Sequence, residues 1–434
     1  MTKITGKTWL VIVVLALIGQ VAWAVENNFF NRFIQDAFGA SLSDIALMVS
    51  ASALTATATT LFVGAWSDRV GRRKAFVVIG TLAWGLSICA FAALQSISYS
   101  LARDAAAAAS LGITLTIVFD CIMTFFGSLA NDSAFNAWLT DITDDTNRGR
   151  VEGVNSAMPL LSMLVVFGGA MFLMIVGDDG TVTYNYPVFF TIIGVLVIAA
   201  GLMAGALMKD SHPEPRRDVS YISQVTYGFR PSSAREHGML YLVLLAYCIF
   251  AIAMQVIMPY YVLYLRLPSI LGEMYVLVMA PCIIIAAVFT IFYGRRVDSR
   301  GFSRAIIIPL VLFLAGCGVL TVGTAAPLVF AGSMLMLSGY LGSVACFGAA
   351  IRNNTPLDRV GLFQGVRIFA VVLVPMLVGP WIGSAISASS GAVAGFGVVG
   401  DGFTPSSLVF LGGAVVALLT FVVLFFIRRQ QRAS

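Results

Sequence analysis

Carboxylate and amide side chains stand inside long apolar stretches of this sequence, where polar groups are costly and mark function by default. The stretch from residue 9 to 31 carries Gln20, Asn27 and Asn31. On a helix these three side chains fall within about 40° of one another, so they form one polar stripe on an otherwise apolar surface. The stripe is typical of a segment that lines a cavity for a polar solute.

A second stretch, from residue 111 to 139, carries two aspartates, Asp120 and Asp132. A desolvated carboxylate loads and releases a proton near neutral pH, so Asp132 is the best candidate to bind a hydroxylated solute or a proton. Asn136 lies one turn further on and joins it as a solute-binding candidate. Asp120 and Glu26 are further candidates for proton coupling. Two alternatives stay open. Glu26 could be an interfacial residue near the outer membrane surface, and Asp132 could be a residue of the cytoplasmic rim without a role in binding or coupling.

Amide and phenol groups also occur in the stretch from residue 239 to 265. Gln255, Tyr260 and Tyr261 offer hydrogen bonds and ring faces, which suit sugars. Aromatic residues near the outer interface also form a plain membrane belt, and that alternative stays open. Glu152 and Arg367, each at the start of an apolar stretch, are interpreted as gate contacts or as simple anchors of a helix start.

The elements that must position these residues are membrane-spanning helices. The chain of 434 residues is 59% hydrophobic and 11% charged, which excludes an ordinary soluble domain. Apolar runs of about 20 residues each cross a bilayer core as helices. We count twelve such runs, at residues 9–31, 43–66, 75–96, 111–139, 151–176, 186–208, 239–265, 270–293, 305–323, 327–351, 361–388 and 405–427.

The distribution of charge predicts a multi-pass protein of the cell membrane with both termini in the cytoplasm. Most Lys and Arg residues fall on the side of the termini, as expected for cytoplasmic loops. The net charge of +5 is therefore attributed to basic residues that set the orientation of the chain in the membrane, and not to a surface that binds nucleic acid. The N-terminal apolar run resembles a signal peptide, but we expect it to be retained as the first span. All six cysteines lie in apolar runs, and neither a metal site nor a cofactor is predicted.

The chain divides into two similar halves. Three local patterns of the first half recur in the same order in the second, which predicts a duplication of six plus six helices. We expect an N-terminal six-helix bundle over residues 1–208, a cytoplasmic linker over 209–238, and a C-terminal six-helix bundle over 239–434. The linker is polar, basic and contains prolines.

Between the second and third runs lies the stretch "GAWSDRVGRRK", here called the charged loop (residues 64–74). Gly71 permits a tight turn, and the basic residues after it, Arg72, Arg73 and Lys74, hold the loop on the cytoplasmic side. A carboxylate among these cations forms a contact that breaks and reforms, as a gate requires. The candidate gating residues are Gly64, Asp68, Arg69, Gly71, Arg72, Arg73 and Asp298, the last being the counterpart of Asp68 in the second half.

The charged loop resembles the signature loop of the major facilitator superfamily, and the resemblance extends over the whole chain. It implies an all-α membrane fold of two six-helix bundles that rock around a central solute site. It also implies that Asp68 and its arginines stabilise the outward-facing state. The stretch 131–156 is similar to glycoside–pentoside–hexuronide cation symporters and to sucrose–proton transporters, and Asp132 matches the sugar-binding aspartate of the first group.

Departures from that group limit the comparison. Its cation-binding aspartates fall at Ala56 and Thr60, which favours proton coupling or uncoupled movement over sodium. We therefore expect a secondary active transporter for a sugar or glycoside, with a co-transported proton, working as a monomer in the lipid bilayer. The alternatives are an exporter of amphipathic compounds and a transporter-like sensor that moves no solute. No motif for an enzyme appears.

Overall fold

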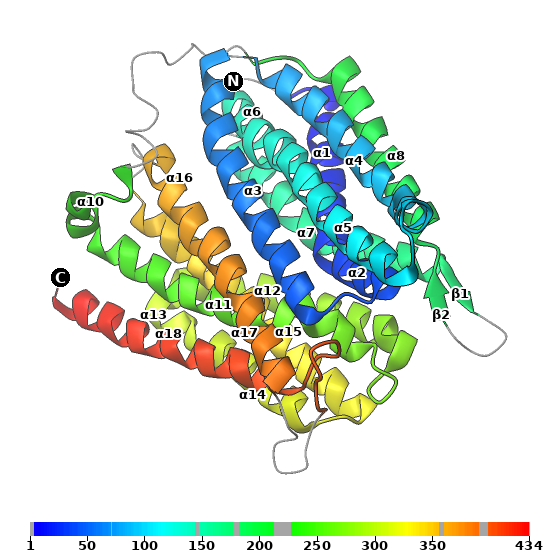
Figure 1. The fold of residues 1–434 in the computed structure, drawn as a ribbon. Coiled ribbons are helices and arrows are strands. Elements are labelled where there is room, and N and C mark those ends of the chain that lie inside the picture. The colour runs from blue at the N-terminus through cyan, green and yellow to red at the C-terminus, as the bar shows by residue number, and fades with distance from the viewer. Residues whose placement is uncertain are drawn as a thin grey trace. The chain divides into compact units, whose positions relative to one another are not determined.

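The computed structural model is built almost entirely of long helices (Figure 1). It describes residues 4–70, 72–143, 147–176, 182–211, 227–355, 360–389 and 398–433. Eleven helices in this part of the chain are long and apolar enough to cross a membrane. The predicted fifth run corresponds to a shorter apolar helix, Ala157–Met171. The predicted all-α membrane fold is confirmed.

Contacts divide the chain into two compact units, which are described separately. Unit 1 comprises Met1–Ala40 and Leu54–Val219, and unit 2 comprises Ser41–Ala53 and Ser220–Ser434. The first part of the second predicted span therefore groups with the C-terminal helices. Within unit 2 this part is held by hydrogen bonds, among them one of 3.0 Å from the Trp381 indole to the Ser50 hydroxyl.

The helices of unit 1 follow the predicted spans, with one small sheet between the fifth and sixth. Its elements are α1 (Gly6–Val25), η1 (Glu26–Phe30), α2 (Asn31–Phe38), α3 (Leu42–Val70, shared with unit 2), α4 (Arg73–Leu101), α5 (Ala105–Gly127), η2 (Ser128–Phe135), α6 (Asn136–Ile142), α7 (Arg148–Met171), β1 (Met174–Val176), β2 (Val182–Tyr184) and α8 (Tyr186–Leu207).

Unit 2 is also built of helices and has no sheet in its described residues. Its elements are α10 (Pro231–Glu236), α11 (Gly238–Leu265), η3 (Gly272–Met274), α12 (Tyr275–Arg300), α13 (Phe302–Ala305), α14 (Ile307–Val322), α15 (Ala326–Asn354), α16 (Val360–Ile368), η4 (Phe369–Leu373), α17 (Val374–Ser389) and α18 (Leu408–Ala433).

The antiparallel hairpin of β1 and β2 corrects the predicted end of the fifth run. We expected that run to continue to residue 176, but α7 ends at Met171 and Met174 pairs with Tyr184. Apolar composition alone does not separate a short strand from the end of a helix. The next helix starts where Asn185 accepts a hydrogen bond of 3.2 Å from the Val188 backbone, a signal that the sequence does carry.

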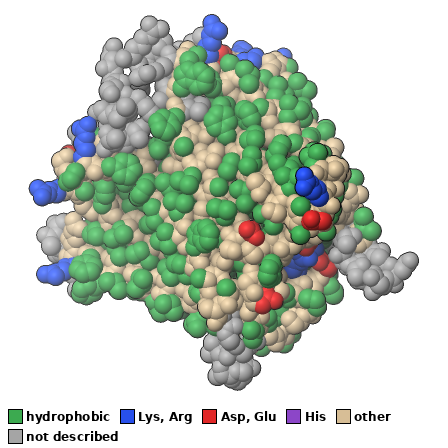
Figure 2. All heavy atoms as spheres, viewed as in Figure 1, with side chains coloured by type: hydrophobic (Ala, Val, Ile, Leu, Met, Phe, Trp, Pro, Cys, Tyr) green, Lys and Arg blue, Asp and Glu red, His purple; other side chains and the backbone are tan. Residues whose placement is uncertain are grey.

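Small residues bring the helices of unit 1 close together. A Cβ atom on Gly85 of α4 would lie 2.7 Å from the Gly194 carbonyl of α8, and a Cβ on Gly194 would lie 2.7 Å from the Gly85 carbonyl. Helix pairs in membranes are held by such close packing, because lipid removes the hydrophobic drive between helices. The visible face in Figure 2 is rich in hydrophobic side chains, as a lipid-facing surface requires.

Three of the predicted spans change to π-helix along their length, at η1, η2 and η4. A π-helical turn shifts the register of the side chains that follow, and such turns are frequent at functional sites. Two of the three segments contain candidate residues from the sequence. Glu26 and Asn27 lie in η1, and Asp132 lies in η2.

Candidate functional site

Asp132 is the centre of a polar site in unit 1. Its half-buried carboxylate accepts hydrogen bonds from the Ser128 hydroxyl at 3.1 Å and from the Asn131 amide at 3.4 Å. The Trp23 indole, which belongs to α1, lies beside the same carboxylate. The site therefore joins the first and fourth predicted spans through one acidic group.

The two spans approach closely beside this carboxylate. A Cβ atom on Gly19 of α1 would lie 2.6 Å from the Asn131 side-chain oxygen, so only glycine fits without a shift. Asn131 is 8% exposed and bonded to Asp132. Gly19 thus allows α1 and η2 to bring Trp23 to the carboxylate.

The polar stripe predicted on the first span lies near this contact. Asn27 is exposed, and its amide donates to the Trp23 carbonyl at 2.7 Å. Gln20 is half-buried, while Asn31 is 5% exposed and donates to the Asn27 carbonyl at 3.4 Å. Gln20 and Asn27 therefore present amides on the helix that carries Trp23, whereas Asn31 lies inside the unit.

Asn136, predicted beside Asp132, is exposed at the start of α6. Its amide donates to the carbonyls of Asn131 and Asp132 at 3.1 and 3.2 Å. These bonds hold the turn in which η2 passes into α6. Its amide therefore helps to fix the backbone that carries the carboxylate.

The two other acidic candidates lie on facing elements of unit 1. The Thr124 hydroxyl of α5 donates to the Glu26 carboxylate of η1 at 3.1 Å. Asp120 lies one turn before Thr124 on the same helix and is 1% exposed. Glu26 and Asp120 therefore occupy one region of the interface between the first and fourth spans.

The candidates of the seventh span lie in unit 2, on α11. Gln255 is half-buried, and the Tyr260 hydroxyl lies 2.6 Å from the Pro380 carbonyl and 3.2 Å from the Leu42 carbonyl. Tyr261 is 2% exposed, and its ring meets the Phe410 ring of α18 edge-on, with 6.2 Å between the ring centroids. Both phenol groups therefore take part in packing between helices of unit 2.

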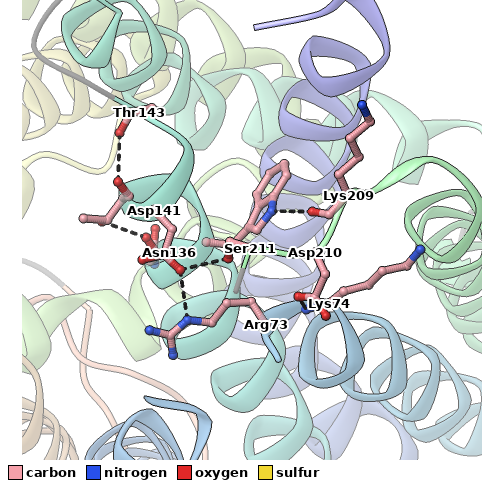
Figure 3. A network of polar contacts seen from close by, with 10 residues as sticks. Arg73, Lys74, Asn136, Asp141, Thr143, Lys209, Asp210 and Ser211 are labelled. Atoms are coloured by element: carbon pink, nitrogen blue, oxygen red, sulfur yellow. Dashed lines mark hydrogen bonds and ion pairs between the residues drawn. The ribbon is translucent and has the colours of Figure 1, made fainter. Parts of the chain in front are cut away.

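A network of polar contacts surrounds the start of α4, next to the charged loop (Figure 3). Arg73 pairs with Asp141 of α6, with 3.2 Å between Nε and Oδ2. Ser211 donates to the same oxygen at 2.9 Å, and the Lys74 backbone N–H donates to Asp210 at 3.0 Å. The network joins α4, α6 and the segment after α8, and it includes one predicted gating residue, Arg73.

The remaining gating candidates are described only in part. Arg72 is exposed at the N-terminus of α4, and Arg367 is exposed on α16. Gly71 lies outside the described residues. The backbones of Gly64, Asp68, Arg69, Glu152 and Asp298 are helical, and the side chains of the four charged residues among them lie outside the described part of the chain. Gly301 follows Asp298 by three positions, as Gly71 follows Asp68, and has φ +74°, a conformation that favours glycine.

Sequence reasoning missed three residues that complete these sites. Trp23 follows Gln20 by three positions and so shares its helix face, a signal that the sequence carries. Asp141 lies two residues beyond the predicted end of the fourth run, at residue 139, and reads as a solvated residue. Thr124 gives no signal in the sequence, because only the packing of α5 on η1 brings its hydroxyl to Glu26.

The fold and these sites define a multi-pass membrane protein with polar side chains held inside its helical units, as in solute transporters. The family model of the Major Facilitator Superfamily matches residues 8–373. The chain therefore belongs to the major facilitator superfamily. No curated protein sequence matches it significantly.

Solved structures of the superfamily share this fold. A bacterial homolog of the human lysosomal transporter Spinster, in an inward-facing and occupied conformation, has a TM-score of 0.70 at 14% identity and covers 98% of this chain and 97% of its own. The xylose transporter XylE from E. coli has a TM-score of 0.68 at 12% identity over 95% and 97% of the two chains. A point mutant of the nucleoside transporter NupG has a TM-score of 0.67 at 12% identity over 96% and 99%.

Proposed function

We propose that this protein is a secondary active transporter that moves a small sugar or glycoside across the cell membrane by alternating access, together with a proton. The observation that carries the proposal is the Asp132 carboxylate, half-buried within a predicted span, hydrogen-bonded by Ser128 and Asn131 and flanked by the Trp23 indole. A carboxylate with an indole and amides around it suits a neutral, hydroxylated ring, because each hydroxyl both donates and accepts hydrogen bonds.

Proton coupling rests on the same interface between the first and fourth spans. Asp132, Glu26 and Asp120 place three carboxylates within two helices that cross the membrane. Ionisable side chains inside membrane-spanning helices mark proton and substrate pathways in transporters. Protonation and solute binding on neighbouring groups of one unit give a direct route to coupling.

The movement itself is proposed to follow the two-bundle plan. The six-helix bundles 1–208 and 239–434, joined by the linker 209–238, rock against each other, and both termini lie in the cytoplasm. Asp68, Arg69 and the neighbouring residues of the charged loop stabilise the outward-facing state, while Glu152, Arg367 and Asp298 contribute to gating. The protein works as a monomer. XylE, a xylose transporter by name, has a similar fold, which agrees with a sugar as substrate.

Counterflow in liposomes tests the substrate class apart from the coupling. Purified protein is reconstituted in liposomes loaded with an unlabelled mono- or disaccharide, and entry of the labelled sugar is followed without a pH gradient. We expect transient accumulation with at least one sugar and none with liposomes that lack protein. Absence of counterflow with every sugar, together with counterflow of a nucleoside or an amphipathic cation, would refute the proposed substrate class.

A further inference from the structure

Trp23 is placed to do more than fill space on α1. Its half-buried ring shares a helix face with Gln20 and Asn27, and its indole lies beside Asp132. The two hydrogen-bond partners of that carboxylate, Ser128 and Asn131, come from the helix of Asp132 itself. Trp23 thus approaches the carboxylate from another helix.

The ring of Trp23 is supported from behind by a second indole. Trp84 of α4 is 1% exposed, and the two ring centroids lie 5.2 Å apart at an interplanar angle of 50°. Trp84 is itself confined, because a Cβ atom on Gly127 would lie 2.7 Å from its ring. A buried aromatic behind a half-exposed one fixes the orientation of the outer ring.

The surroundings of the Trp23 ring are both apolar and polar. Asn27, which donates to the Trp23 carbonyl, is exposed, and so is Asn136 on α6. An indole ring offers a flat apolar surface, on which the C–H face of a sugar ring packs by dispersion and loss of hydration. The amides and the carboxylate nearby are suited to the hydroxyl groups at the edge of such a ring.

We propose that Trp23 contacts the substrate, as a stacking surface for a pyranose ring whose hydroxyl groups bind Asp132, and that its indole N–H orients that carboxylate. The inference rests on the proposed function, since it names the part of a sugar that the site recognises. It assigns two tasks to one side chain, and two substitutions separate them. Trp23→Phe keeps an aromatic ring and removes the N–H donor, whereas Trp23→Ala removes both.

Uptake kinetics of the full-length protein separate these tasks. We expect Trp23→Ala to raise the KM for sugar by at least about fivefold, the loss expected for one stacking contact. Trp23→Phe should raise KM by about threefold and shift the pH profile of uptake to higher pH, because a carboxylate that loses a donor takes up its proton more readily. Trp9→Phe, on the same helix, is the control and should leave both quantities unchanged.

Tryptophan fluorescence gives a readout that does not need transport. Addition of a transported sugar to purified protein should change the emission of the wild type and of Trp9→Phe, and the change should be absent in Trp23→Phe. If Trp23→Ala has the same KM and pH profile as the wild type, or if Trp23→Phe keeps the fluorescence response, Trp23 does not have the proposed role. Failure of the wild type to take up any sugar would instead refute the proposed function.

Discussion

Arg73 and Asp141 form an ion pair with 3.2 Å between Nε and Oδ2, joining the start of α4 to the end of the fourth span. The exposed fractions of the two side chains are 7% and 21%, so the pair is only partly screened by solvent. The same carboxylate oxygen accepts a bond from Ser211, after α8. Three segments of unit 1 therefore depend on one acidic group.

The first prediction concerns this ion pair. Asp141→Asn should lower the free energy of unfolding by about 1–3 kcal/mol, because it removes the negative charge from this ion pair. The double variant Arg73→Gln, Asp141→Asn should lose less than the sum of the two single variants. Thermal unfolding of the protein in detergent measures both. Lys74→Gln is the control, since Lys74 enters the network through its backbone N–H. Strictly additive losses would contradict the pairing.

The second prediction concerns the close approach of Gly19 to Asn131. Gly19→Ala should lower the free energy of unfolding by about 1–3 kcal/mol and reduce solute uptake, because the added Cβ forces α1 and η2 apart. Gly168→Ala is a matched control in a helix of the same unit, since no atom lies within 4 Å of an added Cβ there. Equal stability and uptake in the two variants would show that the approach is not required.

The sequence predicts the helical fold well, for a physical reason. Apolar runs of membrane length have no alternative to helix in a bilayer, so composition and length are sufficient. The same argument cannot detect the hairpin at Met174–Val176, because a strand of three apolar residues has no distinct periodicity. Nor does it predict the π-helical segments, which depend on how neighbouring helices pack.

The candidate site is predictable in its residues and not in its contacts. Asp132 stands out in the sequence because a carboxylate in a span is costly. Its partner Trp23 is far away in the chain and becomes a neighbour only because Gly19 lets two helices approach. The burial of Asn31 also depends on how the helices pack. Asn31 belongs to the same predicted polar stripe as Asn27, and yet it is 5% exposed.

The third prediction concerns the bond from Thr124 to Glu26. A donor stabilises the charged form of a carboxylate, so Thr124→Val should make Glu26 easier to protonate and move the pH profile of uptake to higher pH. Glu26→Gln should remove this part of the pH dependence altogether. Thr114→Val is the control on the same helix, because Thr114 donates to the Ser110 carbonyl. A pH profile that is the same in all these variants excludes Glu26 from proton coupling.

The fourth prediction concerns Asp68 of the charged loop. If its carboxylate holds the outward-facing state through charge-assisted hydrogen bonds of about 1.5–3 kcal/mol, Asp68→Asn shifts the balance of states by about tenfold or more. We expect most solute uptake to be lost while the amount of protein in the membrane stays normal. Uptake and surface labelling of the variant measure the two quantities. Full uptake in Asp68→Asn would rule out this role.

The central claim is that Asp132 couples the movement of a sugar to a proton. We would measure external pH in lightly buffered, de-energised cells that express the protein, while mono- and disaccharides are added one at a time. We expect alkalinisation with at least one sugar in the wild type and none with that sugar in Asp132→Asn, at equal amounts of protein in the membrane. An alkalinisation that persists unchanged in Asp132→Asn, or no pH change with any sugar in the wild type, would show that Asp132 does not couple a sugar to a proton.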